Sequence, residues 1–196
     1  MITFIKTLRY ETNPKETDVF EYLTLLGLQK IDPASTANSF LTLDADVIFY
    51  SPLKRVATTI RLPKHKKITA VKKDALKEIV FDLEKLCSKQ EYQKYKSKIV
   101  RRRFKEAFIQ DALPVKRAFI FREIKDILRL CLIYQEATVA IVSHSFRLKI
   151  MEAFIKTKGK IISNPALIHT YIFDDQKTYE FGEGFTIDTK DLQFLR

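Results

Sequence analysis

The sequence predicts an α/β fold, a layered sheet with helices packed against it. Two short apolar runs, residues 45–50 and 138–142, are typical of strands buried on both faces. Longer segments with helical spacing of apolar residues lie between such runs. The chain has 196 residues, is 46% hydrophobic, and shows neither an internal repeat nor a linker, so we expect one domain over residues 1–196.

In the first half, Ile2, Phe4, Ile5 and Leu8 predict a strand. Asp18 can cap a helix that runs to about residue 26, and Gly27 ends it as glycine commonly does. The same periodicities predict four more elements: a strand at 45–50 stopped by Pro52, a helix at 53–62, a strand at 68–71 and a helix at 76–86.

In the second half, the highly charged segment 90–108 and the segment 114–134 are predicted helices. The buried strand 138–142 is followed by a helix at 146–157 that Gly159 closes. Residues 166–173 and 178–181 predict the strands of a hairpin, and apolar residues alternate in the tail at Phe185 and Ile187.

The formal net charge of +11 favours anionic partners: phosphorylated small molecules, nucleic acid or an anionic surface. Much of it lies in two basic stretches, residues 54–73 and 94–105, and aromatic residues are interleaved in the second. No nucleic-acid motif accompanies them. We therefore interpret both as solvated basic faces, with attraction of a polyanionic ligand and nucleic-acid binding as the less favoured alternatives.

Several classes of protein are excluded. Cys87 and Cys131 lack disulfide or zinc-type spacing and are expected to be buried thiols. There is no metal-ligand cluster, glycine-rich phosphate loop or dinucleotide fingerprint, so we expect neither metal nor cofactor. We also expect no membrane partner and a cytoplasmic location, because no leader pattern or spanning apolar stretch is present.

Two segments carry chemistry on their own residues. Ser51-Pro-Leu-Lys-Arg55 places an arginine at a predicted helix start, and a guanidinium beside backbone N–H groups favours a phosphate dianion. His144 directly follows a buried strand, so its imidazole lies at the strand's mouth. Because ligands of α/β sheets bind beyond the carboxyl ends of the strands, Arg55 and His144 can meet in one pocket.

These segments, with Arg9-Tyr10 near the N-terminus, resemble the three signature segments of the histidine phosphatase superfamily (phosphoglycerate mutase-like proteins). The resemblance implies a single-domain three-layer sandwich, a mostly parallel central sheet with helices on both sides. It implies a helical insertion or cap at about 84–113 that selects the substrate. It also implies a phosphate site formed by Arg9, Asn13, Arg55 and His144.

The N-terminal signature departs from the family pattern. The family reads Arg-His-Gly followed by Glu-Thr, and the His is the nucleophile, whereas no histidine precedes His65 in this chain. If Arg9-Tyr10 aligns with Arg-His, Tyr10 replaces the nucleophile; if Glu11-Thr12 aligns with Glu-Thr, Arg9 replaces it. We favour the first alignment, and in either case phosphohistidine cannot form at that position.

The resemblance also assigns catalytic roles. His144 would contact the transferred phosphoryl group, where a protonated imidazole stabilises its oxygens. Ser145 stands where the family has Gly and narrows the pocket. Leu76-Lys-Glu-Ile-Val-Phe81 is similar to the segment that carries the general acid, which would be Glu78; a surface helix carboxylate is the alternative.

Three functions remain open. The first is a degenerate family member that binds phosphate or a phosphorylated small molecule or protein and is catalytically impaired. The second is an active phosphatase or phosphomutase, with His144 as nucleophile and Glu78 as acid, or with water attacking an Arg-held phosphate. The third is a non-enzymatic interaction module whose basic surface binds anions or nucleic acid.

Overall fold

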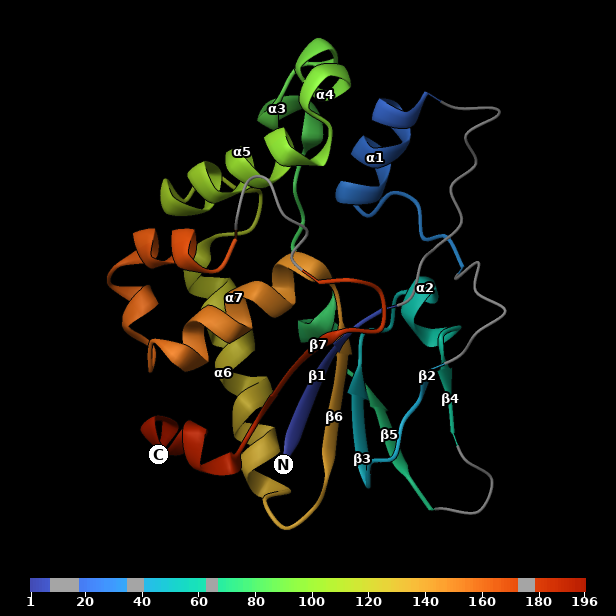
Figure 1. The fold of residues 1–196 in the computed structure, drawn as a ribbon, viewed down its shortest axis with the longest axis vertical. Coiled ribbons are helices and arrows are strands. Elements are labelled where there is room, and N and C mark those ends of the chain that lie inside the picture. The colour runs from blue at the N-terminus through green and yellow to red at the C-terminus, as the bar shows by residue number, and fades with distance from the viewer. Residues whose placement is uncertain (8–17, 35–40, 63–66, 173–178) are drawn as a thin grey trace.

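A computed structural model describes residues 1–7, 18–34, 41–62, 67–172 and 179–196. Five strands form the central sheet in the order β5-β3-β6-β1-β7 (Figure 1). Their bounds are β1 Ile2–Lys6, β3 Val47–Tyr50, β5 Thr69–Lys72, β6 Val139–Ser143 and β7 Gly184–Ile187. All neighbours are parallel except β1 and β7. This confirms the predicted α/β fold with a mostly parallel sheet.

Helices lie on both faces of the sheet and above its carboxyl edge (Figure 1). α6 (Arg117–Ile133) and α7 (Ser145–Lys156) cover one face; α2 (Lys54–Ala57) covers the other, beside the short parallel pair β2 (Leu41–Thr42) and β4 (Ile60–Arg61). Above the carboxyl edge lie α1 (Val19–Gly27), α3 (Leu83–Leu86), α4 (Lys89–Tyr95) and α5 (Ser97–Ile109). Four 3-10 helices complete the described chain: η1 Asp74–Leu76, η2 Lys160–Ile162, η3 Pro165–Thr170 and η4 Thr189–Leu195.

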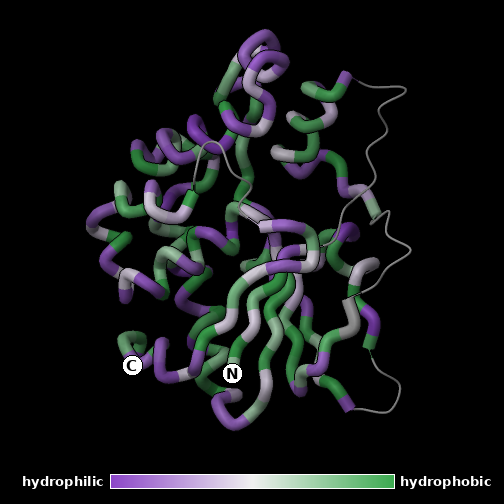
Figure 2. The backbone as a smooth tube through the Cα atoms, in the orientation of Figure 1, coloured by the Kyte–Doolittle hydropathy of each residue, from purple (hydrophilic) through white to green (hydrophobic). Residues whose placement is uncertain are grey.

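The core lies on both sides of β6, whose five residues are all buried. Ile141 and its neighbours Phe4 and Phe49 face α6 and α7, while Ala140 and Val142 pack against Ile48 and Val56 on the other side. The strands are accordingly hydrophobic along their length (Figure 2). Burial on two faces explains why the sequence shows continuous apolar runs here instead of alternation. In the described part of the chain, no helix has the length and apolar character to cross a membrane.

Two predicted helices are wrong because tertiary hydrogen bonds hold the backbone differently. The segment 53–62 forms only the short α2 and then β4, which pairs with β2. Of the segment 76–86, only residues 83–86 form an α-helix (α3), and residues 77–82 run without helical structure between η1 and α3. There the amide of Phe81 donates to Gly27 O at 3.1 Å, and Gln29 donates to Glu78 O at 2.6 Å. These bonds to the end of α1 replace helical ones.

The predicted hairpin is also wrong within the described residues. Residues 165–170 form η3, with Pro165 at its start and the amide of Tyr171 donating to Ile168 O at 3.0 Å. Residues 179–181 are in no strand, and 173–178 lie outside the described residues. Instead β7 takes the edge of the sheet beside β1. Proline fixes the φ of a first helical turn, which the apolar spacing alone did not reveal.

The segment 90–108 is two helices instead of one. Ser88 begins α4 with a capping box, and Lys96 interrupts the segment with a φ of 50°. The capping box was readable as Ser88 followed three residues later by Glu91. The positive φ of Lys96 was not readable, because with its ψ of −141° this conformation strongly favours glycine.

We predict that Gly27→Ala destabilises the packing of α1. A Cβ at this position would lie 2.7 Å from Phe81 O and 2.9 Å from its ring. Alanine is otherwise the better helix former, so a loss of about 1–3 kcal/mol in urea unfolding would reflect overpacking. Val19→Ala, on the exposed side of the same helix, is the control. A Gly27→Ala variant at least as stable as wild type would contradict the close approach.

Candidate active site

The carboxyl ends of β1, β3 and β6 are level, because Lys6 pairs with Ser143 and Tyr50 with Val142. The next residues, Thr7, Ser51 and His144, therefore emerge at one edge. Thr7, Ser51 and His144 are all buried there, at 3%, 0% and 3% exposure.

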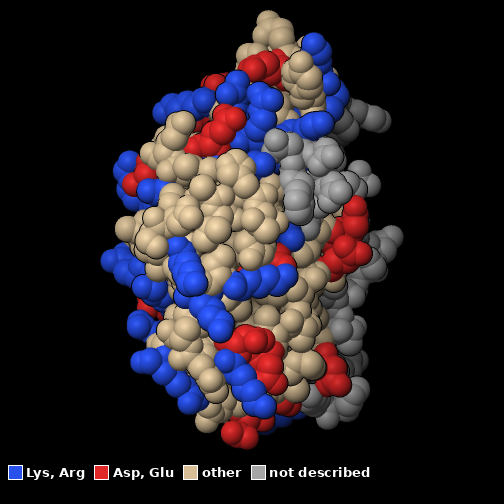
Figure 3. Space-filling model, turned by 60° about the vertical axis from the view of Figure 1, so that its left-hand side comes forward, with Lys and Arg blue, Asp and Glu red and all other residues tan. Residues whose placement is uncertain are grey.

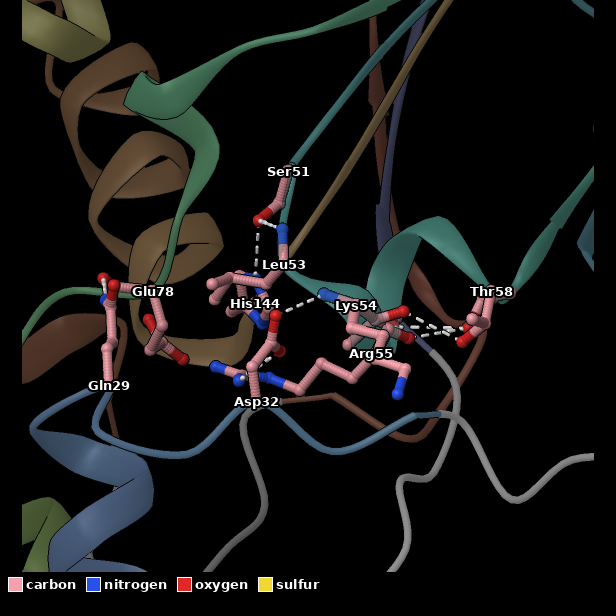
Figure 4. Close-up of polar contacts among 11 residues, drawn as sticks. Gln29, Asp32, Ser51, Leu53, Lys54, Arg55, Thr58, Glu78 and His144 are labelled. Carbon is pink, nitrogen blue, oxygen red and sulfur yellow. Dashed lines mark hydrogen bonds and ion pairs between the residues drawn. The ribbon is translucent and has the colours of Figure 1, made fainter.

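Arg55, on α2, is brought to the same edge and is only 3% exposed. Its carbonyl oxygen accepts hydrogen bonds from the hydroxyls of Thr7 at 2.9 Å and Thr59 at 2.8 Å. The Thr7 bond fastens α2 to the end of β1, and the Thr59 bond closes the turn that follows α2. The guanidinium Nη1 lies 3.5 Å from Oδ1 of Asp32 (Figure 4).

Asp32 shows that this place accepts an anionic group. Its Oδ2 accepts the amide of Lys54 at 2.6 Å while its Oδ1 faces Arg55. One carboxylate thus takes both the backbone donor and the guanidinium that the sequence analysis assigned to phosphate. The sequence analysis did not assign Asp32 to the site, because an Asp-Pro pair in a loop gives no indication of an ion pair with an arginine far along the chain.

His144 is held by Ser51: its Nε2 lies 3.0 Å from Ser51 Oγ, which also accepts the amide of Leu53 at 3.3 Å. Burial lowers the pKa of His144 well below its ordinary value, and the positive charges of Arg55 and Arg147 lower it further. The imidazole is therefore neutral near neutral pH. The protonated form that the resemblance implies requires an added negative charge beside it.

Glu78 lies on the extended segment between η1 and α3, not on a surface helix, and its carboxyl group reaches the N-terminus of α7. Oε1 accepts the amides of Ile79 and Arg147, both at 3.0 Å, and Oε2 lies 3.4 Å from the amide of Phe146. Burial raises the pKa of Glu78 and outweighs these amides and Arg55, which lower it. Because Oε1 already accepts two amide hydrogen bonds, Oε2 is the oxygen atom better placed to carry a proton.

Arg147 is a site residue that sequence reasoning missed. It is 4% exposed, and its Nε donates to Lys77 O at 3.0 Å. Its Nη1 lies 3.0 Å from Oε2 of Glu123 on α6, an ion pair without the alignment of a hydrogen bond. Arg147 thus ties the Glu78 segment to α7 and α6. A single arginine on a helix gave no sign of this role.

A cavity of about 320 Å³ opens above these groups. Arg55, Glu78, His144 and Ser145 line its base, and Figure 4 shows Arg55 extending toward Asp32 below His144 and Glu78. Lys6 and Thr7, at the end of β1, also line it, and the remaining walls come from α1, α3, α4, α5 and α7, and from Phe81 and Phe181. The structure therefore brings three of the predicted site residues, Arg55, Glu78 and His144, to one cavity.

Other expected site residues are not placed. Arg9, Tyr10 and Asn13 lie outside the described residues. Neither of the other two histidines was expected in the site: His65 lies outside the described residues, and His169 is exposed on η3. Among the described residues there is no group of three or more His, Cys, Asp or Glu side chains that could hold a metal ion.

Ligands of α/β proteins with a mostly parallel sheet bind beyond the carboxyl ends of the strands, which is where this chain holds a buried Arg, His and carboxyl group. A family model described as the histidine phosphatase superfamily (branch 1) matches residues 22–161, and the chain belongs to that superfamily. The matched range contains Arg55, Glu78 and His144 and begins after the Arg9–Asn13 segment. No curated protein sequence matched the chain.

We predict that His144 makes stability depend on pH. Its folded pKa lies below the unfolded value of about 6.5, so below that pH the unfolded chain binds more protons and the free energy of unfolding falls. Between about pH 7.5 and about pH 5.5, wild type should lose about 1 kcal/mol more than His144→Gln in urea unfolding.

His169→Gln, which changes an exposed imidazole, is the matched control and should keep the wild-type pH dependence. Glu78 is present in wild type and in both variants, so its contribution to the pH dependence of the free energy of unfolding cancels in the comparison. An unchanged pH dependence in His144→Gln would show that this imidazole is not buried in its neutral form.

Proposed function

We propose that the chain binds phosphate or a phosphorylated ligand at the base of this cavity, and that it is catalytically impaired because the nucleophilic histidine is replaced. The supporting observation is that Arg55 and His144, each 3% exposed, line one cavity at the sheet's carboxyl edge. The ligand classes are a phosphorylated small molecule or a phosphorylated protein.

The electrostatics of the site favour a dianion. A phosphoryl group that displaces the Asp32 carboxylate from Arg55 would bring greater charge and offer two oxygens to the planar guanidinium. Its charge would also raise the pKa values of His144 and Glu78, so both groups would be more protonated in the complex. Protonated His144 then donates to phosphoryl oxygens, and protonated Glu78 no longer repels them.

The impairment follows from the chemistry of the replacements. Arginine is cationic at every accessible pH, and an unperturbed tyrosine has a pKa of about 10, so neither is a ready nucleophile. The chain has three histidines, and of the two in the described residues His169 is exposed on η3 while His144 Nε2 contacts Ser51. We propose that Arg9 and Asn13 add to the phosphate site and that Tyr10 stands in the nucleophile's place.

One observation favours a second candidate, an active phosphatase or phosphomutase. Burial raises the pKa of Glu78, which suits a general acid that must be protonated before it donates to a leaving oxygen. In this candidate His144, or a water molecule held beside an Arg-bound phosphate, would attack phosphorus. Turnover in the wild type that both His144→Ala and Arg55→Ala abolish would support it.

The basic surface gives less support to a nucleic-acid module. Lys and Arg are spread among Asp and Glu over the face in Figure 3. In the second basic stretch, Arg101 and Lys105 are buried, and Arg103 pairs with Glu91 at 3.5 Å and with Glu106 at 3.0 Å. We propose instead that α4 and α5 belong to a cap over the site of a single domain. Buried free Cys87 and Cys131 fit a reducing compartment such as the cytoplasm.

We predict that Arg55→Ala weakens binding of inorganic phosphate by about tenfold or more, the equivalent of one charge-assisted hydrogen bond. Isothermal titration calorimetry measures this directly. Lys54→Ala, which removes the neighbouring exposed cation, is the matched control and should change affinity by less than about threefold. Equal phosphate binding by wild type and Arg55→Ala would overturn the proposed site.

We predict that wild type hydrolyses p-nitrophenyl phosphate no faster than Arg55→Ala, and that Tyr10→His introduces turnover. The substitution restores an imidazole where the favoured alignment places the nucleophile. Arg9→His tests the other alignment and should not restore activity. Robust wild-type turnover that needs both His144 and Arg55 would exclude impairment while leaving the phosphate site in place.

A further inference from the structure

The upper part of the cavity is apolar. Above Arg55 and His144, its described lining consists mainly of hydrocarbon side chains from several elements: Leu23, Leu26, Phe81, Leu83, Val100 and Phe146. We propose that the site selects a phosphomonoester with an apolar, aromatic body over a polyhydroxylated sugar phosphate. This inference rests on the proposed phosphate site and names its substrate class.

One wall is a fixed aromatic cluster. Phe81 and Phe146 meet edge to face with ring centroids 5.7 Å apart, and Phe146 stacks on Phe104 at 3.9 Å. Phe104 is completely buried on α5 and also meets Phe81 edge to face. Because each ring is held by the other two, the surface that Phe81 and Phe146 present to the cavity is preorganised for a planar apolar group.

A second, adjoining wall is held by α1. Leu23 and Leu26 reach the cavity from α1, and Leu83 reaches it from α3. A small apolar cluster under these helices, formed by Phe20, Leu83, Cys87 and Ile99, fastens α1 to α3 and α5. The amide of Phe81 bonded to Gly27 O fixes the end of α1 against the aromatic wall. The side chains of α1 and the aromatic cluster are therefore held in fixed positions relative to each other.

On these two walls hydrocarbon side chains outnumber polar ones. Among the described residues above the base, the polar lining is Tyr92 on α4 with Ser97 and Arg101 on α5, where Arg101 Nη1 donates to Ser97 Oγ at 3.0 Å. Hydroxyl groups placed against leucine and phenylalanine side chains lose water without gaining hydrogen bonds, which is unfavourable. An aromatic ring in the same space gains both area burial and ring contacts.

The test compares ligands that share the phosphoryl group. Calorimetry gives the affinities of wild type for inorganic phosphate, for 1-naphthyl phosphate and for glycerol 2-phosphate. We expect 1-naphthyl phosphate to bind about tenfold or more tightly than glycerol 2-phosphate. If any ligand is hydrolysed, an unreactive phosphonate of the same body replaces it.

Two variants locate the selectivity. Val100→Thr replaces a lining methyl group by a hydroxyl of similar shape, and it should reduce 1-naphthyl phosphate binding by a larger factor than inorganic phosphate binding. Val19→Thr makes the same change on an exposed part of α1 and should alter neither. A Val100→Thr effect equal for both ligands would overturn the inference.

The outcomes separate this inference from the proposed function. If wild type binds inorganic phosphate in an Arg55-dependent manner but prefers glycerol 2-phosphate, or shows no preference, the apolar selectivity is wrong and the phosphate site stands. If wild type binds no inorganic phosphate and none of the esters, the phosphate site itself is wrong and the inference falls with it.

Discussion

The parallel pairing of β6 with β1 and β3 is the constraint on which the site depends. Lys6 is level with Ser143, and Tyr50 with Val142, so the three strands end together. Since all five residues of β6 are buried, a shift of one residue would exchange its two buried faces. The same register that fills the core therefore places Ser51 and His144 within hydrogen-bonding distance.

A balance of buried charge follows from that convergence. Arg55 and Arg147 are almost fully buried, and each has an acidic partner, Asp32 and Glu123 respectively. Buried ions without partners are strongly disfavoured, so these carboxylates keep the arginines in place before any ligand arrives. No carboxylate in the described part of the chain forms an ion pair with His144, and burial keeps its imidazole neutral. It is thus the group whose charge responds most directly to an incoming anion.

The helices above the sheet bury part of a highly charged segment of the sequence. The segment 94–105 looks like a solvated basic face, yet Phe104, Arg101 and Lys105 are buried on α5. The break at Lys96 separates α4 from α5 and lets α5 present Val100 and Arg101 to the cavity. These helices add apolar lining to a cavity whose base is strongly polar. In the function that we propose, the base would hold the phosphoryl group and the apolar lining would contact the body of the ligand, so the two tasks would fall on separate elements.

The sequence by itself determined the α/β class, the buried strands β3 and β6, and the candidates Arg55 and His144. These signals are local, because an apolar run identifies a buried strand and the residue after it lies at the carboxyl end of that strand. Only the tertiary structure decided that Glu78 lies on an extended segment, and that Asp32 and Arg147 belong to the site. Their hydrogen bonds and ion pairs join residues far apart in the chain, and the buried backbone must satisfy its hydrogen bonds across elements, so local pattern carries no record of them.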